Sequence, residues 1–202
     1  MVAHPLVEDA LAALRDRRTP AAEFRRLARR VSLVLVAEAT RDLATAESDV
    51  RTPLEEARVR RLARRVVVVP VLRAGLGMLE AFLDLVPSAE VGYFGLERDE
   101  TTALARCYYE KMPEGLSEAQ VFLLDPMLAT GGSAALAISD LERRGARAVR
   151  LVSIVAAPQG VAHIATVAPE SVVFTAALDR ELDERKFILP GLGDFGDRLF
   201  GK

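Results

Sequence analysis

The chain has 202 residues, 28% of them charged, and its 27 basic and 29 acidic side chains give a formal net charge of −2. This balance lacks the basic footprint of a nucleic-acid-binding or anionic-membrane-binding protein, so we expect neither partner. The single cysteine, Cys107, excludes a disulfide framework and a multi-cysteine zinc site. No apolar run approaches the ~18 residues of a membrane-spanning helix. The amino terminus lacks a secretory signal pattern, so we expect one cytoplasmic domain covering residues 1–202.

Residues 1–65 are predicted to be a helical N-terminal region. Within 20–40, apolar side chains such as Phe24, Leu27 and Val31 recur at spacings of three and four, which is typical of one face of an amphipathic helix. The other face carries Arg25, Arg26, Arg29 and Arg30. Two interpretations stay open for these arginines: a solvated helix face, or a patch that contacts RNA.

From Val66 onward, short apolar runs alternate with helical patterns. The predicted strands and helices are 66–72, 75–86, 91–96, 120–124, 133–144, 149–156, 160–167 and 171–177. Strands rich in β-branched residues that alternate with helices of this length indicate a parallel sheet covered on both faces. The sequence therefore predicts an α/β fold with a parallel β-sheet flanked by helices.

Two segments break this alternation. Residues 97–115 are polar and long, which is typical of a functional lid loop. The tail, 189–201, reads LPGLGDFGDRLFG and interleaves four glycines with aspartate and phenylalanine. It is either a shaped binding loop or a frayed terminus.

The most informative stretch is 121–133, VFLLDPMLATGGS, in which an apolar strand ends at Asp125 and a glycine turn opens a helix. The N-terminus of a helix offers unpaired N–H groups and a partial positive charge, which suit a phosphate group. Thr130 and Ser133 add hydroxyl donors, and an ionised Asp125 suits sugar hydroxyls. The alternative is a plain strand-to-helix turn with a serine cap. A Walker loop is excluded because no lysine follows the glycines.

A second strand-turn-helix of this design occurs at 67–78, VVVPVLRAGLGM, where Arg73 could grip phosphate oxygens. Arg98, at the start of the predicted lid, could close over a charged substrate. Two anion sites with a sugar-hydroxyl acceptor between them fit a sugar that carries phosphate at one end and diphosphate at the other.

At this point the sequence resembles the uracil phosphoribosyltransferases. The resemblance is carried by five segments: His4–Val7, Glu38-Ala39, Pro70–Met78, Asp125–Ser133 and the tail PGLGDFGDRLFG. It implies a phosphoribosyltransferase fold with N-terminal helices and a small hood at 178–201. It also implies the reaction of uracil with 5-phosphoribosyl 1-diphosphate (PRPP) to give UMP and diphosphate, in pyrimidine salvage.

The resemblance also implies roles for individual residues. The residues expected to bind ribose and its 5′-phosphate are Asp125, Pro126, Met127, Leu128, Ala129, Thr130, Gly131, Gly132 and Ser133. Arg73 and Arg98 are expected to hold the diphosphate, and Asp194 to contact PRPP, so these three are the expected catalytic residues. Ile188, Gly193, Asp194 and Phe195 are expected to form the uracil pocket.

No metal site built from protein side chains is expected, because Mg²⁺ would arrive on PRPP. A homodimer or homotetramer is expected, while activation by GTP stays open. Two other functions stay open too. Asp183, Lys186 and Phe187 depart from the asparagine, glycine and tyrosine common in the family, which keeps a shifted base preference in view. The basic N-terminal helices keep a catalytically weak, nucleotide-sensing RNA-binding regulator in view.

Overall fold

A central β-sheet organises the molecule, which is described by a computed structural model over residues 1–98 and 105–201. Its main strands run in the order β10 (Val172–Leu178), β9 (Arg150–Ala156), β7 (Ala119–Leu124), β3 (Arg65–Leu72), β5 (Tyr93–Arg98) and β6 (Ala105–Lys111). Neighbouring strands on this path are parallel except β5 and β6, which are antiparallel. The short strands β4 (Glu90–Val91) and β8 (Met127–Leu128) pair with β3 and β9. The predicted parallel sheet is confirmed.

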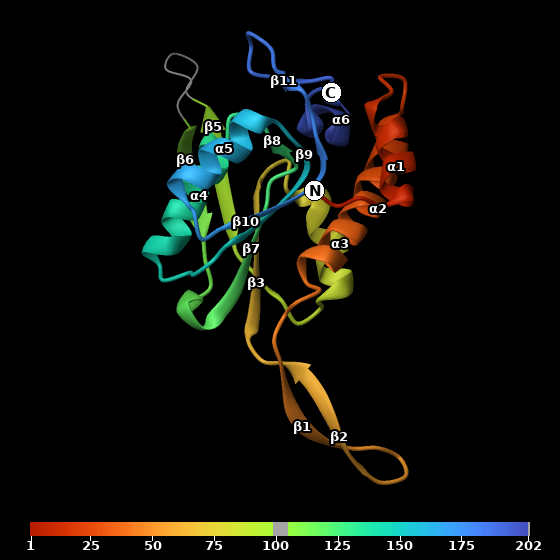
Figure 1. The fold of residues 1–202 in the computed structure, drawn as a ribbon, viewed down its shortest axis with the longest axis vertical. Coiled ribbons are helices and arrows are strands. Elements are labelled where there is room, and N and C mark those ends of the chain that lie inside the picture. The colour runs from red at the N-terminus through yellow and green to blue at the C-terminus, as the bar shows by residue number, and fades with distance from the viewer. Residues whose placement is uncertain (99–104, 202) are drawn as a thin grey trace.

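Helices cover both faces of the sheet (Figure 1). One layer comprises α1 (Pro5–Arg15), α2 (Ala21–Ala39), α3 (Leu76–Leu85) and α6 (Phe195–Phe200). The other layer comprises α4 (Gly132–Arg143) and α5 (Pro158–Val167). A 3₁₀ turn, η1 (Leu116–Glu118), leads into β7.

The valine run of β3 shows why this sheet is buried on both sides. Val66 and Val68 pack in the cluster that includes α1, α2 and α3, while Val67 and Val69 pack in the cluster beneath α4 and α5. Successive side chains of a strand point to opposite faces, so a continuous apolar run serves two cores.

The prediction that residues 1–65 are helical is wrong for their second half. β1 (Thr45–Arg51) and β2 (Glu56–Leu62) form an antiparallel hairpin, which we call the arm; it projects from the body (Figure 1). The turn is closed where the Thr52 amide donates to the Glu55 carbonyl at 2.9 Å. Both faces of the arm are largely solvated, so it lacks the apolar alternation that reveals a half-buried strand.

The prediction of a loop across 97–115 is also wrong in part. Residues 105–111 form β6, which pairs with β5 as a hairpin at the edge of the sheet. Residues 99–104 of the predicted lid lie outside the described residues.

The predicted hood, 178–201, which includes the tail, folds into a short hairpin and a helix. β11 (Glu181–Leu182) pairs with β12 (Ile188–Leu189), and α6 follows. In the part of the chain that the structure describes, no helix combines the length and apolar character needed to cross a membrane.

Candidate functional site

A cavity of about 370 Å³ lies where β3 and β7 end, between the start of α4 and the tail. In parallel α/β sheets, ligands bind beyond the carboxyl ends of the strands. The predicted site residues that line the cavity are Asp125, Met127, Leu128, Ala129, Thr130, Gly131, Gly132, Ser133, Ile188, Gly193, Asp194 and Phe195. The structure thus brings the predicted phosphate loop (125–133) and the predicted uracil pocket to opposite walls of one cavity.

The phosphate loop is held by backbone hydrogen bonds to β9. The Asp125 amide donates to the Val152 carbonyl at 3.2 Å, and the Pro126 carbonyl accepts from the amides of Ile154 and Val155 at 3.0 and 3.1 Å. Pro126 is buried and does not line the cavity. It therefore anchors the loop, whereas Asp125 lies at the cavity wall.

α4 begins at the cavity with a glycine at its N-cap position. Its N-cap is Gly131, in the left-handed region with φ +82°, where a residue with a Cβ would be strained. A Cβ there would also stand 3.0 Å from the carbonyl oxygen of Gly160. The alternative of a serine-capped turn does not hold, because the N-cap residue is a glycine; the side chain that does meet this helix end is that of Thr130, whose Oγ1 accepts from the Gly132 amide at 3.4 Å. The first residues of α4, Gly132, Ser133 and Ala134, line the cavity, and the N-terminus of a helix is a place that suits an anion.

The opposite wall is formed by the tail and supported by α2. Phe195 is buried, and its ring meets that of Phe24 edge-on with centroids 5.2 Å apart. Asp194 lines the cavity, and its carboxylate caps α6 by accepting a hydrogen bond from the Asp197 amide at 2.8 Å. The tail is thus a shaped loop and not a frayed terminus.

Of the two predicted diphosphate arginines, Arg73 lies outside the lining of the cavity. Arg73 is exposed and does not line the cavity, although its neighbours Leu72 and Ala74 do. Its guanidinium lies over the ring of Phe200, 5.5 Å from the centroid. Arg98 is the last residue of β5 and adjoins the segment outside the described residues.

Further residues line the cavity without having been predicted as site residues. They are Val71, Leu72, Ala74, Leu96, Glu97, Ala134, Arg185, Lys186 and Phe187. Three of these residues, Arg185, Lys186 and Phe187, belong to the predicted hood. They lie in a turn closed by Asp183, whose carboxylate accepts from the Phe187 amide at 2.8 Å. The polar run between two short apolar stretches signals this turn, but nothing local shows that it reaches the cavity.

The fold is that of phosphoribosyltransferases. A hypoxanthine phosphoribosyltransferase from Trypanosoma cruzi superposes with a TM-score of 0.52 at 12% identity, covering 78% of this chain and 75% of that one, and this likeness concerns the fold alone. A protein from Aquifex aeolicus superposes with a TM-score of 0.94 at 38% identity, over 98% of this chain and 96% of that one.

The family model described as uracil phosphoribosyltransferase matches residues 1–202. A uracil phosphoribosyltransferase from Thermus thermophilus is 49% identical over all of this chain and 97% of its own length. One from Staphylococcus epidermidis is 46% identical over 98% of this chain and 95% of its own. The chain therefore belongs to the uracil phosphoribosyltransferase family.

Proposed function

We propose that the protein transfers the phosphoribosyl group of PRPP to uracil, giving UMP and diphosphate in pyrimidine salvage. The observation that supports this most directly is that one cavity has the N-terminus of α4, with its N-cap Gly131, on one wall and the tail on the other. A phosphate group suits the first wall. The peptide groups of the tail offer donors and acceptors for the edge of a pyrimidine.

In this reaction N1 of uracil forms a bond to C1 of the ribose, the bond from C1 to the diphosphate oxygen breaks, and N1 loses its proton. Positive charge develops on the sugar ring while the leaving diphosphate gains negative charge. Asp125 is proposed to hold the ribose hydroxyls, and Arg73 and Arg98 to stabilise the diphosphate as its charge grows. Alignment of the two substrates between opposite walls can supply about 7–11 kcal/mol of the barrier.

Mg²⁺ is proposed to bind through PRPP. Among residues 1–98 and 105–201, no group of three His, Cys, Asp or Glu side chains could hold a metal ion. Asp125 and Asp194 nevertheless line the cavity, and Mg²⁺ commonly takes one or two carboxylates together with phosphate oxygens and water. Asp125 and Asp194 are the residues that would hold the ion, which would supply charge that stabilises the departing diphosphate.

The direct test mixes pure protein, Mg²⁺ and PRPP with uracil, cytosine, hypoxanthine or orotate in turn, and chromatography measures the nucleotide formed. UMP from uracil is the expected product. Formation of none at any protein concentration would refute the proposal, and a higher kcat/KM for another base would establish a shifted base preference. GTP added to the same assay tests whether a purine nucleotide activates the enzyme.

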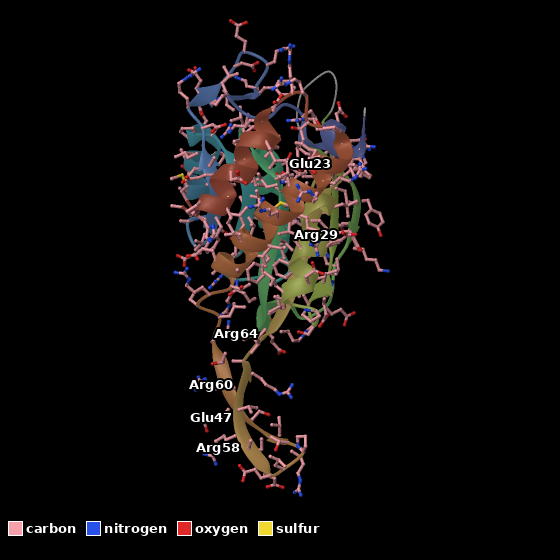
Figure 2. All side chains as sticks on the ribbon, turned by 90° about the vertical axis from the view of Figure 1, so that its right-hand side faces the viewer. Glu23, Arg29, Glu47, Arg58, Arg60 and Arg64 are labelled. Carbon is pink, nitrogen blue, oxygen red and sulfur yellow. The ribbon has the colours of Figure 1, made fainter. Side chains whose placement is uncertain are left out.

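The RNA-binding alternative loses its main support in the structure. The four arginines on α2 each have a partner: Arg25 donates to the Leu199 carbonyl, Arg26 pairs with Glu23, Arg29 with Asp84, and Arg30 with Asp9. Figure 2 labels Glu23 and Arg29 on this helix. Acidic partners cancel most of the positive field that RNA binding needs.

We infer that the protein forms a homo-oligomer through the arm. A two-stranded hairpin is marginally stable when it stands alone in water, and Leu54 at its tip is 93% exposed. Glu47 and Asp49 lie on β1 opposite Arg60 and Arg58 on β2, so both signs of charge follow the arm (Figure 2). Sedimentation equilibrium should give a dimer or tetramer, and replacing residues 47–60 with a short Gly-Ser turn should shift the mass toward the monomer.

A further inference from the structure

The base-side wall of the cavity, formed by residues 188–195 of the tail and the strand before it, is held by a buried carboxylate. This carboxylate does not itself line the cavity. Asp179 follows β10, its side chain is 6% exposed, and its amide donates to the carbonyl of Ala156 at 2.8 Å. Its Oδ2 accepts from the amide of Gly191 at 2.8 Å. Asp179, at the end of the sheet, thereby holds the amide of Gly191 in the tail.

The carbonyl of that same residue is held from α1. Arg15, the last residue of α1, meets both carboxylate oxygens of Asp179, with Nη2 to Oδ1 at 2.7 Å and Nη1 to Oδ2 at 2.8 Å. Its Nη1 also donates to the Gly191 carbonyl at 2.8 Å. The planar fork of an arginine suits a bidentate pairing with a carboxylate and leaves further N–H donors for a neighbouring carbonyl. The Arg15–Asp179 pair therefore fixes both peptide groups of Gly191.

Gly191 lies between the residues that form the base-side wall. Ile188 and Gly193 line the cavity on either side of it. Gly191 has φ +58°, and a Cβ there would lie 2.1 Å from the Ile188 carbonyl oxygen. A shift of this one residue therefore moves the wall at both ends.

A second arginine holds the next peptide. Arg198 donates to the Leu192 carbonyl at 2.8 Å, to the Asp16 carbonyl at 2.7 Å, and to the Leu14 carbonyl. Its guanidinium lies 4.4 Å from the centroid of the Phe24 ring, and burial lowers the pKa of this arginine below its usual value. Two successive carbonyls of the tail are thus tied to the end of α1.

We propose that Arg15 and Asp179 are positioning residues for the nucleobase: together they hold the tail in the conformation that binds it, so that α1 controls base binding without touching the substrate. This inference rests on the proposed function for the identity of the base. It distinguishes the two walls, since the phosphate loop is anchored by backbone hydrogen bonds to β9, whereas Arg15 and Asp179 hold Gly191.

The test compares KM for uracil with KM for PRPP in Arg15→Met, Arg15→Lys and the double variant Arg15→Met with Asp179→Asn. The double variant leaves no unpaired buried carboxylate, so it keeps the test available if Arg15→Met fails to fold. Arg18→Met is the matched control, because Arg18 lies just beyond α1 in an exposed pair with Asp16. We expect Arg15→Met and the double variant to raise KM for uracil about tenfold, with KM for PRPP unchanged and a smaller rise for Arg15→Lys.

A purely structural role would lower Tm and leave the ratio of the two KM values as in wild type, which would overturn the proposal. Hydrogen–deuterium exchange supplies a readout that needs no turnover. Exchange over 188–195 should quicken in the double variant but not in Arg18→Met, while exchange over 125–133 stays as in wild type. Absence of UMP with the wild-type protein would refute the proposed function, whereas unchanged exchange over 188–195 refutes the positioning role.

Discussion

The two walls of the cavity are built in opposite ways. The phosphate loop is nine consecutive residues, 125–133, held by the backbone of the adjacent strand β9. The base-side wall, 188–195, is held by hydrogen bonds that join the tail to the end of the first helix across 176 to 184 residues of sequence. One wall is thus specified locally and the other by tertiary contacts, so changes in α1 should affect base binding and spare the phosphate loop.

The largest effect is expected at the phosphate loop. Asp125→Asn removes the negative charge proposed to accept ribose hydroxyls, and hydrogen bonds to charged groups contribute about 1.5–3 kcal/mol. We expect kcat/KM for PRPP to fall about 100-fold, which corresponds to about 2.7 kcal/mol. Initial rates at varied PRPP measure this. An unchanged kcat/KM in the folded variant would remove the sugar-hydroxyl role.

On the base side, Gly191→Ala should destabilise the fold. Its Cβ would lie 2.1 Å from a carbonyl oxygen, at φ +58°, so strain and steric conflict together should lower the free energy of unfolding by about 2 kcal/mol. Gly193→Ala is the control. Gly193 also has positive φ, but its Cβ would meet only Arg198 Cδ at 3.6 Å, and about 1 kcal/mol is expected there. Urea unfolding measures the free energy of unfolding of both variants. Equal losses would show that the backbone shifts to remove the contact between the new Cβ at 191 and the Ile188 carbonyl oxygen.

A smaller effect is expected for Ser133→Ala at the start of α4, where it tests whether the Ser133 hydroxyl binds PRPP or caps the helix. Ser133 does not cap this helix, so Ser133→Ala should leave Tm unchanged and lower kcat/KM for PRPP about fivefold, or about 1 kcal/mol, through loss of one hydroxyl donor. Ser139→Ala, on the exposed face of α4, should change neither quantity. A fall in Tm for Ser133→Ala alone would mean that the hydroxyl serves the helix.

The same contrast explains what the sequence could predict. The strand ending at Asp125 and the glycine turn that follows it are signalled within 13 residues, so both the loop and its place at the end of the sheet were predictable. Arg15 and Asp179 carry no local pattern, because an arginine at the end of a helix and an aspartate after a strand are common on surfaces. Only the fold brings them together. The arm was not predicted because both its faces are largely solvated. Its sequence therefore lacks the alternation of apolar and polar residues by which a strand is recognised.

The smallest expected effect concerns the end of α1 that supports the base-side wall. A side-chain hydrogen bond from Arg18 lowers the pKa of Asp16 to about 2. A carboxyl whose pKa is lower in the folded chain stabilises it above the unfolded pKa of about 3.9, and this contribution is lost as pH falls toward 2. Asp16→Asn should therefore have a slightly lower Tm than wild type at pH 6, and the difference should vanish between pH 4 and pH 2.

Arg18→Met should show the same pH dependence, because it removes the partner of that carboxylate. Both variants should keep the wild-type KM for uracil, since the backbone carbonyl of Asp16, and not its side chain, accepts from Arg198. A Tm difference that stays constant with pH would show that the ion pair does not contribute. A raised KM for uracil would instead show that the charges at this helix end, and not only its backbone, reach the base-side wall.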